Sequence, residues 1–183
     1  DHDGSNSDTP PMLDGKPVTS PVNGCWIASP AILLHEMAKA IATAQPTSEQ
    51  PGETAPAAKN IADIGGWTDP QWVRDHGCDA IAQLAGVTSK VGKPGNAIAV
   101  FQGIIGKLSN NGESLVGAIG FSTSKPAEVP NADVIGALSH SPNGGGHWVA
   151  ATRVRRGRRW VWRMHDAAPF DAERPSLDLV VWR

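Results

Sequence analysis

The stretch HWVAATRVRRGRRWVWRMHD, residues 147–166, decides the fold. It consists of two β-rich runs separated by the polar sequence RRGRR, a pattern that predicts an antiparallel hairpin turning at Gly157. If the turn is centred on Gly157, paired positions sum to about 314, and His147 faces position 167. Asp166 is then a close neighbour of His147 across the ladder.

The two ends of this hairpin carry residue types suited to acid–base chemistry. His147 follows three glycines, Gly144–Gly146, and is expected to face a substrate cleft with Gly146 at its edge. A carboxylate at Asp166 would hold the imidazole of His147 in its working tautomer and stabilise the imidazolium. His165 points to the opposite face by strand alternation and is interpreted as a structural residue.

Residues 25–44 are predicted to form a long helix. Apolar side chains recur at steps of four and three, which lines one helix face: Ile27, Ala31, Leu34, Ala38 and Ile41. Pro30 leaves two alternatives, because proline removes a hydrogen bond inside a helix but is accepted in its first turn. Either the helix begins near Cys25 and kinks at Pro30, or Ser29 caps a helix that starts at Pro30.

Shorter helices are predicted at 70–85 and 97–109, and the character of the chain changes after them. The later segments are short, rich in β-formers, and separated by glycine, proline or asparagine. They comprise 115–119, 133–138, 147–154, 160–165 and 177–182. Helices first and strands afterwards predict an α+β domain, in which a helical half packs on a C-terminal antiparallel β-sheet.

Length and composition indicate one globular domain preceded by a leader. The chain has 183 residues, of which 40% are hydrophobic and 19% charged, as is usual for a globular domain. Residues 1–17 are polar with scattered glycine and proline, so they are predicted to be a mobile leader or linker, and 18–183 the folded domain. Apolar runs fall short of the ~18 residues that a membrane span needs, so no membrane insertion is expected.

Charge and potential ligands exclude several further classes. A net charge of −2 argues against a general polyanion binder, so no nucleic-acid partner is expected. Cys25 and Cys78 are too few for a disulfide framework. His76 and Cys78 lack a second ligand pair, and His35-Glu36 lacks the second histidine of the zinc-binding helix motif, because lysine stands at position 39. No metal or other cofactor is therefore expected.

The basic residues are concentrated around the hairpin turn. Six of the sixteen lie within eleven positions: Arg153, Arg155, Arg156, Arg158, Arg159 and Arg163. One interpretation is a solvated turn whose charges protect a sheet edge. The other is a docking site for an acidic partner.

The segment NGCWIAS, residues 23–29, contains the candidate nucleophile. A cysteine at the start of a helix lies at the positive end of the helix dipole, which favours the thiolate, and the thiolate is the reactive form. Gly24 leaves room for a substrate backbone to approach. The alternative is that Cys25 is a small buried hydrophobic residue, as free cysteines often are.

Cys25 with tryptophan after it, His147 in a Gly-His-Trp strand and Asp166 at the end of the next strand form an ordered set. This set resembles the papain-like cysteine peptidases, particularly compact bacterial effector and toxin members. The resemblance implies a papain-like fold and a Cys25–His147–Asp166 triad that cleaves protein substrates through an acyl-enzyme, with Trp26 and Trp148 at the cleft. It also implies export from a bacterium to act inside a target cell, with an inhibitor or immunity protein as a further partner.

The chain departs from the papain-like pattern at the oxyanion hole. Those enzymes generally supply a glutamine a few residues before the nucleophile, whereas the first glutamine here is Gln45. Asn23 is the candidate replacement, together with the backbone N–H of Cys25. Loss of one such donor lowers turnover by about 10²–10³ in measured cases.

Three alternatives remain open. A glutamine deamidase or transglutaminase-like acyl transferase uses the same triad on a side-chain amide. A compact peptidoglycan amidase is less favoured, because 122 positions separate Cys25 from His147. A papain-like scaffold without activity could instead bind a partner through the arginine-rich hairpin.

Overall fold

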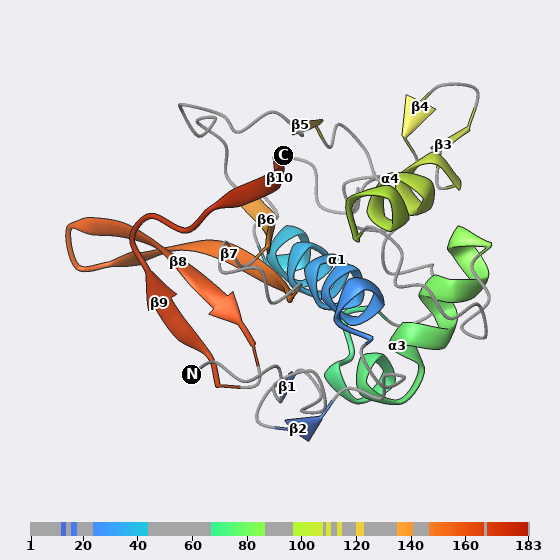
Figure 1. The fold of residues 1–183 in the computed structure, drawn as a ribbon, viewed down its shortest axis with the longest axis horizontal. Coiled ribbons are helices and arrows are strands. Elements are labelled where there is room, and N and C mark those ends of the chain that lie inside the picture. Colours follow the sequence, from blue (N-terminus) through green and yellow to red (C-terminus); the bar gives the residue numbers. More distant parts are fainter. Residues whose placement is uncertain are drawn as a thin grey trace, which may run out of the picture.

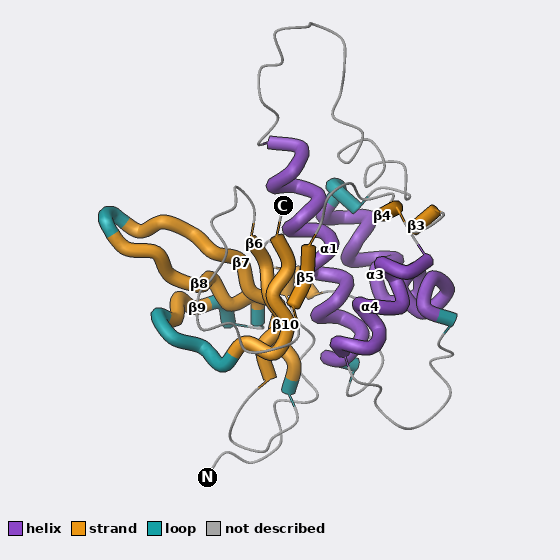
Figure 2. The backbone as a smooth tube through the Cα atoms, turned by 90° about the horizontal axis from the view of Figure 1, so that it is seen from above, coloured by secondary structure: helices purple, strands orange, loops and turns teal. Residues whose placement is uncertain are grey.

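The computed structural model describes residues 12–13, 16–17, 24–43, 67–86, 97–107, 109–110, 113–114, 120–122, 135–140, 147–166 and 168–182. Within these ranges the chain has an α+β fold, which confirms the predicted class: the helices lie beside a main antiparallel sheet (Figure 1). Viewed from above, the helices occupy one side of the molecule and the sheet the other (Figure 2).

Helix α1 (Cys25–Thr43) lies between the sheet and the other two described helices (Figure 1). The carbonyl of Gly24 accepts hydrogen bonds from the N–H groups of Ile27 and Ala28 at 3.0 and 2.9 Å, which starts the helix at Cys25. Pro30 is therefore inside the helix, and the alternative of a helix starting at Pro30 is wrong. Because α1 packs on both sides, its first turns are buried nearly all round, not along one face only.

Helix α3 (Pro70–Ala85) matches the prediction for 70–85, and both ends have clear causes. The side chain of Asp69 accepts a hydrogen bond from the Gln71 N–H at 2.9 Å, and Pro70 occupies the first turn. Gly86 ends the helix in the left-handed conformation, with φ of 66°. Among the described residues, no helix is long and apolar enough to span a membrane.

Helix α4 (Ala97–Lys107) is two residues shorter than predicted. Ser109 and Asn110 form the short strand β3 (Ser109–Asn110), which pairs with β4 (Glu113–Ser114). Serine and asparagine are poor helix formers because their side chains compete for backbone hydrogen bonds. The predicted helix end at residue 109 is therefore two residues too late.

The main sheet has six strands, and every neighbouring pair is antiparallel. In spatial order they are β5 (Gly120–Ser122), β10 (Leu177–Trp182), β6 (Ile135–His140), β7 (Trp148–Arg156), β8 (Arg159–His165) and β9 (Phe170–Ala172). Strands β6, β7, β8 and β10 correspond to four of the predicted segments, while the predicted strand 115–119 lies outside the described residues. Edge strands β5 and β9 were missed, because three residues are too few for an alternating pattern.

The predicted leader also contains structure. Strands β1 (Met12–Leu13) and β2 (Lys16–Pro17) form a two-residue antiparallel ladder inside 1–17. The sequence between them is Asp-Gly, the dipeptide most typical of tight hairpins, and this signal was overlooked. The other leader residues lie outside the described ranges, so their predicted mobility remains a prediction.

The hairpin register differs by one residue from the prediction. Arg156 pairs with Arg159, so the turn has two residues, Gly157 and Arg158, and is not centred on Gly157. Gly157 has φ of 60°, a conformation that glycine adopts without steric cost. As a result Ala150 faces His165. A one-residue shift moves each pairing but keeps the two strand ends adjacent, so His147 and Asp166 remain neighbours.

Helix α1 approaches the sheet closely at strand β6. A methyl group added to Gly136 would lie 2.7 Å from Leu33 Cδ1 and 3.0 Å from Met37 Sδ. Glycine at this position therefore allows the helix to pack directly against the strand. The sheet residues packed in the same core as α1 are Leu138, Ala150, Leu179 and Val181. This packing fixes the position of the helix relative to β7, and hence the position of Cys25.

Candidate active site

The three predicted catalytic residues come from the ends of three elements. Cys25 is the first residue of α1, His147 immediately precedes β7, and Asp166 immediately follows β8. The β7–β8 ladder holds the last two side by side, and packing of α1 on the sheet brings Cys25 to them. The structure thus places Cys25, His147 and Asp166 in one cluster.

His147 and Asp166 form a direct ion pair. The Nε2 atom of His147 lies 2.9 Å from Oδ1 of Asp166, and each side chain is 25% exposed. The hydrogen bond with Asp166 is the largest cause of a raised pKa at His147, and the hydrogen bond with Cys25 adds to it; burial opposes both. The pKa of His147 rises to about 10, so its imidazole is protonated at neutral pH.

Cys25 is half-buried and forms a hydrogen bond with His147. Burial by itself raises the pKa of the Cys25 thiol, but the bond with His147 and the backbone N–H of Trp148 outweigh it. The net effect is a pKa below that of an ordinary cysteine. Because Nε2 of His147 is directed at Asp166, Nδ1 is the ring nitrogen left for the sulfur.

These two shifts together favour a thiolate–imidazolium pair. The pKa of Cys25 is lowered and that of His147 is raised, so both shifts favour transfer of the thiol proton to the ring nitrogen. Cys78 is the opposite case: burial, with a contribution from Asp79, raises the pKa of its thiol to about 12. The chain therefore contains one activated thiol and one inert thiol.

Ser29 joins helix α1, which begins at Cys25, to strand β7, which follows His147. Its hydroxyl donates a hydrogen bond of 2.8 Å to the carbonyl of Trp148, the residue directly after His147. Ser29 stands four residues after Cys25, which places both on the same side of α1. The sequence predicts no more than a helix-capping role for Ser29, because its hydrogen-bond partner is 119 positions away.

We expect Ser29→Ala to slow the reaction of Cys25 while lowering the stability of the fold only modestly. The change leaves the partly buried Trp148 carbonyl without this donor, at about 1 kcal/mol, and removes one hydrogen bond that joins the start of β7 to α1. Ser139→Ala is the matched control, because Ser139 donates a similar hydrogen bond to the Ser176 carbonyl. The thermal unfolding temperature should fall by a similar amount in both variants. The rate of Cys25 alkylation at pH 6 should fall only in Ser29→Ala. Equal rates of Cys25 alkylation in Ser29→Ala and Ser139→Ala would contradict a positioning role for Ser29.

The residues expected at the cleft have different environments. Trp148 is half-buried, and its ring packs on that of His140 with centroids 4.7 Å apart. Trp26 is only 7% exposed and lies in the core, so its side chain offers little surface to a substrate, and its backbone N–H faces the sulfur of Cys25 instead. Asn23 and Gly146 lie outside the described residues.

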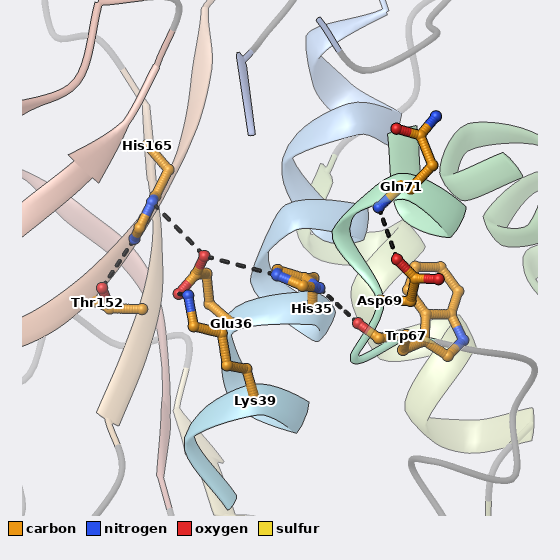
Figure 3. A network of polar contacts seen from close by, with 8 residues as sticks. All are labelled: His35, Glu36, Lys39, Trp67, Asp69, Gln71, Thr152 and His165. Carbon is orange, nitrogen blue, oxygen red and sulfur yellow. Dashed lines mark hydrogen bonds and ion pairs between the residues drawn. The ribbon is translucent and has the colours of Figure 1, made fainter. Parts of the chain in front are cut away.

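A second polar network crosses from the sheet to the helices (Figure 3). His165 Nε2 lies 2.8 Å from the Thr152 hydroxyl, and its Nδ1 is 4.0 Å from Glu36 Oε1. The same Glu36 oxygen is 4.0 Å from Nε2 of the fully buried His35, whose Nδ1 bonds to the Trp67 carbonyl at 2.5 Å. His165 thus has structural partners, as expected from strand alternation. Burial is the main cause of its lowered pKa.

Within the ranges that the structure describes, no group of three or more histidine, cysteine, aspartate or glutamate side chains could hold a metal ion. Comparisons with models of protein families, with curated proteins and with solved structures found no match to this chain.

Proposed function

We propose that this chain is a cysteine hydrolase of papain-like architecture that cleaves peptide bonds in protein substrates. The observation that carries the proposal is the continuous contact from the Cys25 thiol through the His147 ring to the Asp166 carboxylate. The opposite pKa shifts of the two cysteines add support: the pKa of Cys25 is lowered, whereas that of Cys78 is raised. A thiol with a purely structural role needs no lowered pKa.

In the proposed reaction the Cys25 thiolate attacks the carbonyl carbon of the scissile amide and forms a tetrahedral adduct. The adduct collapses when the His147 imidazolium gives its proton to the leaving nitrogen, which departs as an amine and leaves a thioester. Neutral His147 then removes a proton from water, and the resulting hydroxide equivalent attacks the thioester. The acid product leaves, and Cys25 thiolate and His147 imidazolium are regenerated. Asp166 stabilises the His147 imidazolium at both points of the cycle where it is present: before the leaving nitrogen is protonated, and after His147 has taken the proton from water.

The start of α1 supplies positive potential for the developing oxyanion. The first N–H groups of a helix have no acceptor within it, and they point toward the helix N-terminus where Cys25 lies. Cys25 N–H is the candidate first donor. We keep Asn23 as the proposed second donor, in place of the glutamine that papain-like enzymes provide.

Alkylation with iodoacetamide at pH 6 tests the activated thiol. Cys25 should react at least about 100-fold faster than Cys78, because the thiolate is favoured at the half-exposed Cys25 and disfavoured at the buried Cys78. Mass spectrometry of tryptic peptides will assign each modification, and Cys78 serves as the internal control in the same molecule. Equal slow labelling of both cysteines would remove the basis of the catalytic proposal.

The products distinguish a peptidase from the related acyl-transfer reactions. We expect incubation with an unfolded protein substrate to yield new N-termini, detected by mass spectrometry. A gain of one dalton at glutamine side chains without cleavage would instead identify a deamidase that uses the same three residues.

A further inference from the structure

The β7–β8 hairpin extends away from the helices (Figure 2), and its two faces carry different side chains. On one face the arginines are neutralised within the chain. Arg156 Nε and Arg163 Nη1 lie 3.0 and 3.1 Å from the two oxygens of Asp171, and Arg159 Nη1 lies 2.9 Å from Glu173 Oε1. The two arginines lower the pKa of Asp171, so this carboxylate stays ionised.

The opposite face carries two arginines that have no such carboxylate partner in the described part of the chain. Arg155 pairs directly with Trp160, and Arg153 with Trp162, which places these four side chains on one face of the ladder. The guanidinium carbons of Arg153 and Arg155 lie 5.0 and 5.9 Å from the centre of the Trp160 ring. Among the described residues, neither arginine forms an ion pair with a carboxylate. We call Arg153, Arg155 and Trp160 the arginine–tryptophan face.

The aromatic part of this face is open to solvent. Trp160 is 54% exposed although tryptophan is usually packed, and Phe170 on the neighbouring strand β9 is 48% exposed. Phe170 pairs with Met164, so it lies on the same side of the sheet as Trp160. Exposed aromatic rings flanked by arginine are the composition of energetic hot spots in protein interfaces.

We propose that the arginine–tryptophan face is a docking site for an acidic segment of a partner protein. The guanidinium groups of Arg153 and Arg155 would bind carboxylates of the partner, and Trp160 would pack against an apolar side chain between them. The charges on the other face are already satisfied, so the partner binds one side only. This inference does not depend on catalysis by Cys25.

A protein partner fits this face better than a nucleic acid. Affinity for nucleic acid comes from many phosphate contacts, whereas this face presents two arginines on a chain with a net charge of −2. A protein hot spot needs only a few residues. The face is also distinct from the catalytic cluster: residues 147 and 155 are eight strand positions apart, on the order of 26 Å along an extended strand.

The test uses a short fluorescein-labelled peptide of glutamates around a central leucine pair, with fluorescence anisotropy as the readout. The same peptide with glutamine in place of glutamate is the control probe. We expect the glutamate peptide to bind and its affinity to fall with salt. The double variant Arg153→Glu/Arg155→Glu should weaken binding about 30-fold or more, and Trp160→Ala about tenfold.

Lys107→Glu is the matched charge control, since Lys107 is an exposed cation at the end of α4, away from the hairpin. It should bind the glutamate peptide like the unmodified chain. Far-ultraviolet circular dichroism and Cys25 alkylation will verify that the hairpin variants fold. The proposal is overturned if Lys107→Glu weakens binding equally, if the glutamine peptide binds as well, or if no peptide binds. Tighter, Trp160-dependent binding of oligothymidylate would also overturn it in favour of nucleic acid.

Discussion

Cys25→Ala and His147→Ala, made separately, will each reduce peptide hydrolysis by about 10⁵–10⁶-fold, and the double variant will be no slower than either single one. The reason is that the two side chains act as one unit. Without His147 the sulfur loses the hydrogen bond that lowers its pKa, and without Cys25 no acyl-enzyme can form. Steady-state cleavage of a fluorogenic peptide, with the chain at high concentration, measures the residual rate.

Cys78→Ala is the matched control for this experiment. Cys78 is buried in the core, and alanine differs from it by little more than the sulfur, so activity should stay within about twofold while stability falls by about 1 kcal/mol. His147→Ala should also slow Cys25 alkylation at pH 6, whereas Cys78→Ala should not. Full activity of the Cys25→Ala variant would rule out the proposed hydrolase.

Asp166→Asn will reduce hydrolysis by up to about 10⁴-fold and will move the alkaline limit of activity to lower pH. In the unmodified chain the hydrogen bond with Asp166 is the main cause of the raised pKa of His147, about 10. The active pair requires a protonated His147, so activity is present below this pKa and is lost as pH rises through it. Asparagine retains a hydrogen-bond acceptor but has no charge, and the pKa of His147 therefore falls.

The measurement is the rate of Cys25 alkylation and of peptide cleavage from pH 5 to above the His147 pKa of about 10. Asp171→Asn is the control, because Asp171 is also an ion-paired carboxylate on the sheet but contacts arginines and not His147. It should leave the alkaline limit unchanged. If Asp166→Asn retains the profile of the unmodified chain, Asp166 does not set the protonation of His147.

Local sequence pattern was sufficient for the part of the site that a single hairpin builds. His147 and Asp166 are joined by one turn, so alternation and turn chemistry place them together even though the predicted register was one residue off. A one-residue slip changes which side chains face the core, but the ends of the two strands still meet.

Contacts that arise only when distant elements pack were not predictable in this way. The hydrogen bond from Ser29 to Trp148 and the shared carboxylate of Glu36 both join α1 to the sheet, and no short motif encodes either contact. Trp26 illustrates the same limit: a tryptophan beside a nucleophile suits a cleft wall and a core equally well, and only the packing of α1 decides for the core.

The separation of Cys25 from His147 by 122 positions gives the enzyme proposed here a form of latency during synthesis. A ribosome-bound chain exposes its thiol long before its base has been translated, and closing so long a loop is entropically slow. Until α1 docks on the finished hairpin, the thiol lacks the hydrogen bonds with His147 and Trp148 that lower its pKa. The Cys25 thiol of the nascent protein is therefore less reactive than that of the folded protein, and it becomes activated only when the fold is complete.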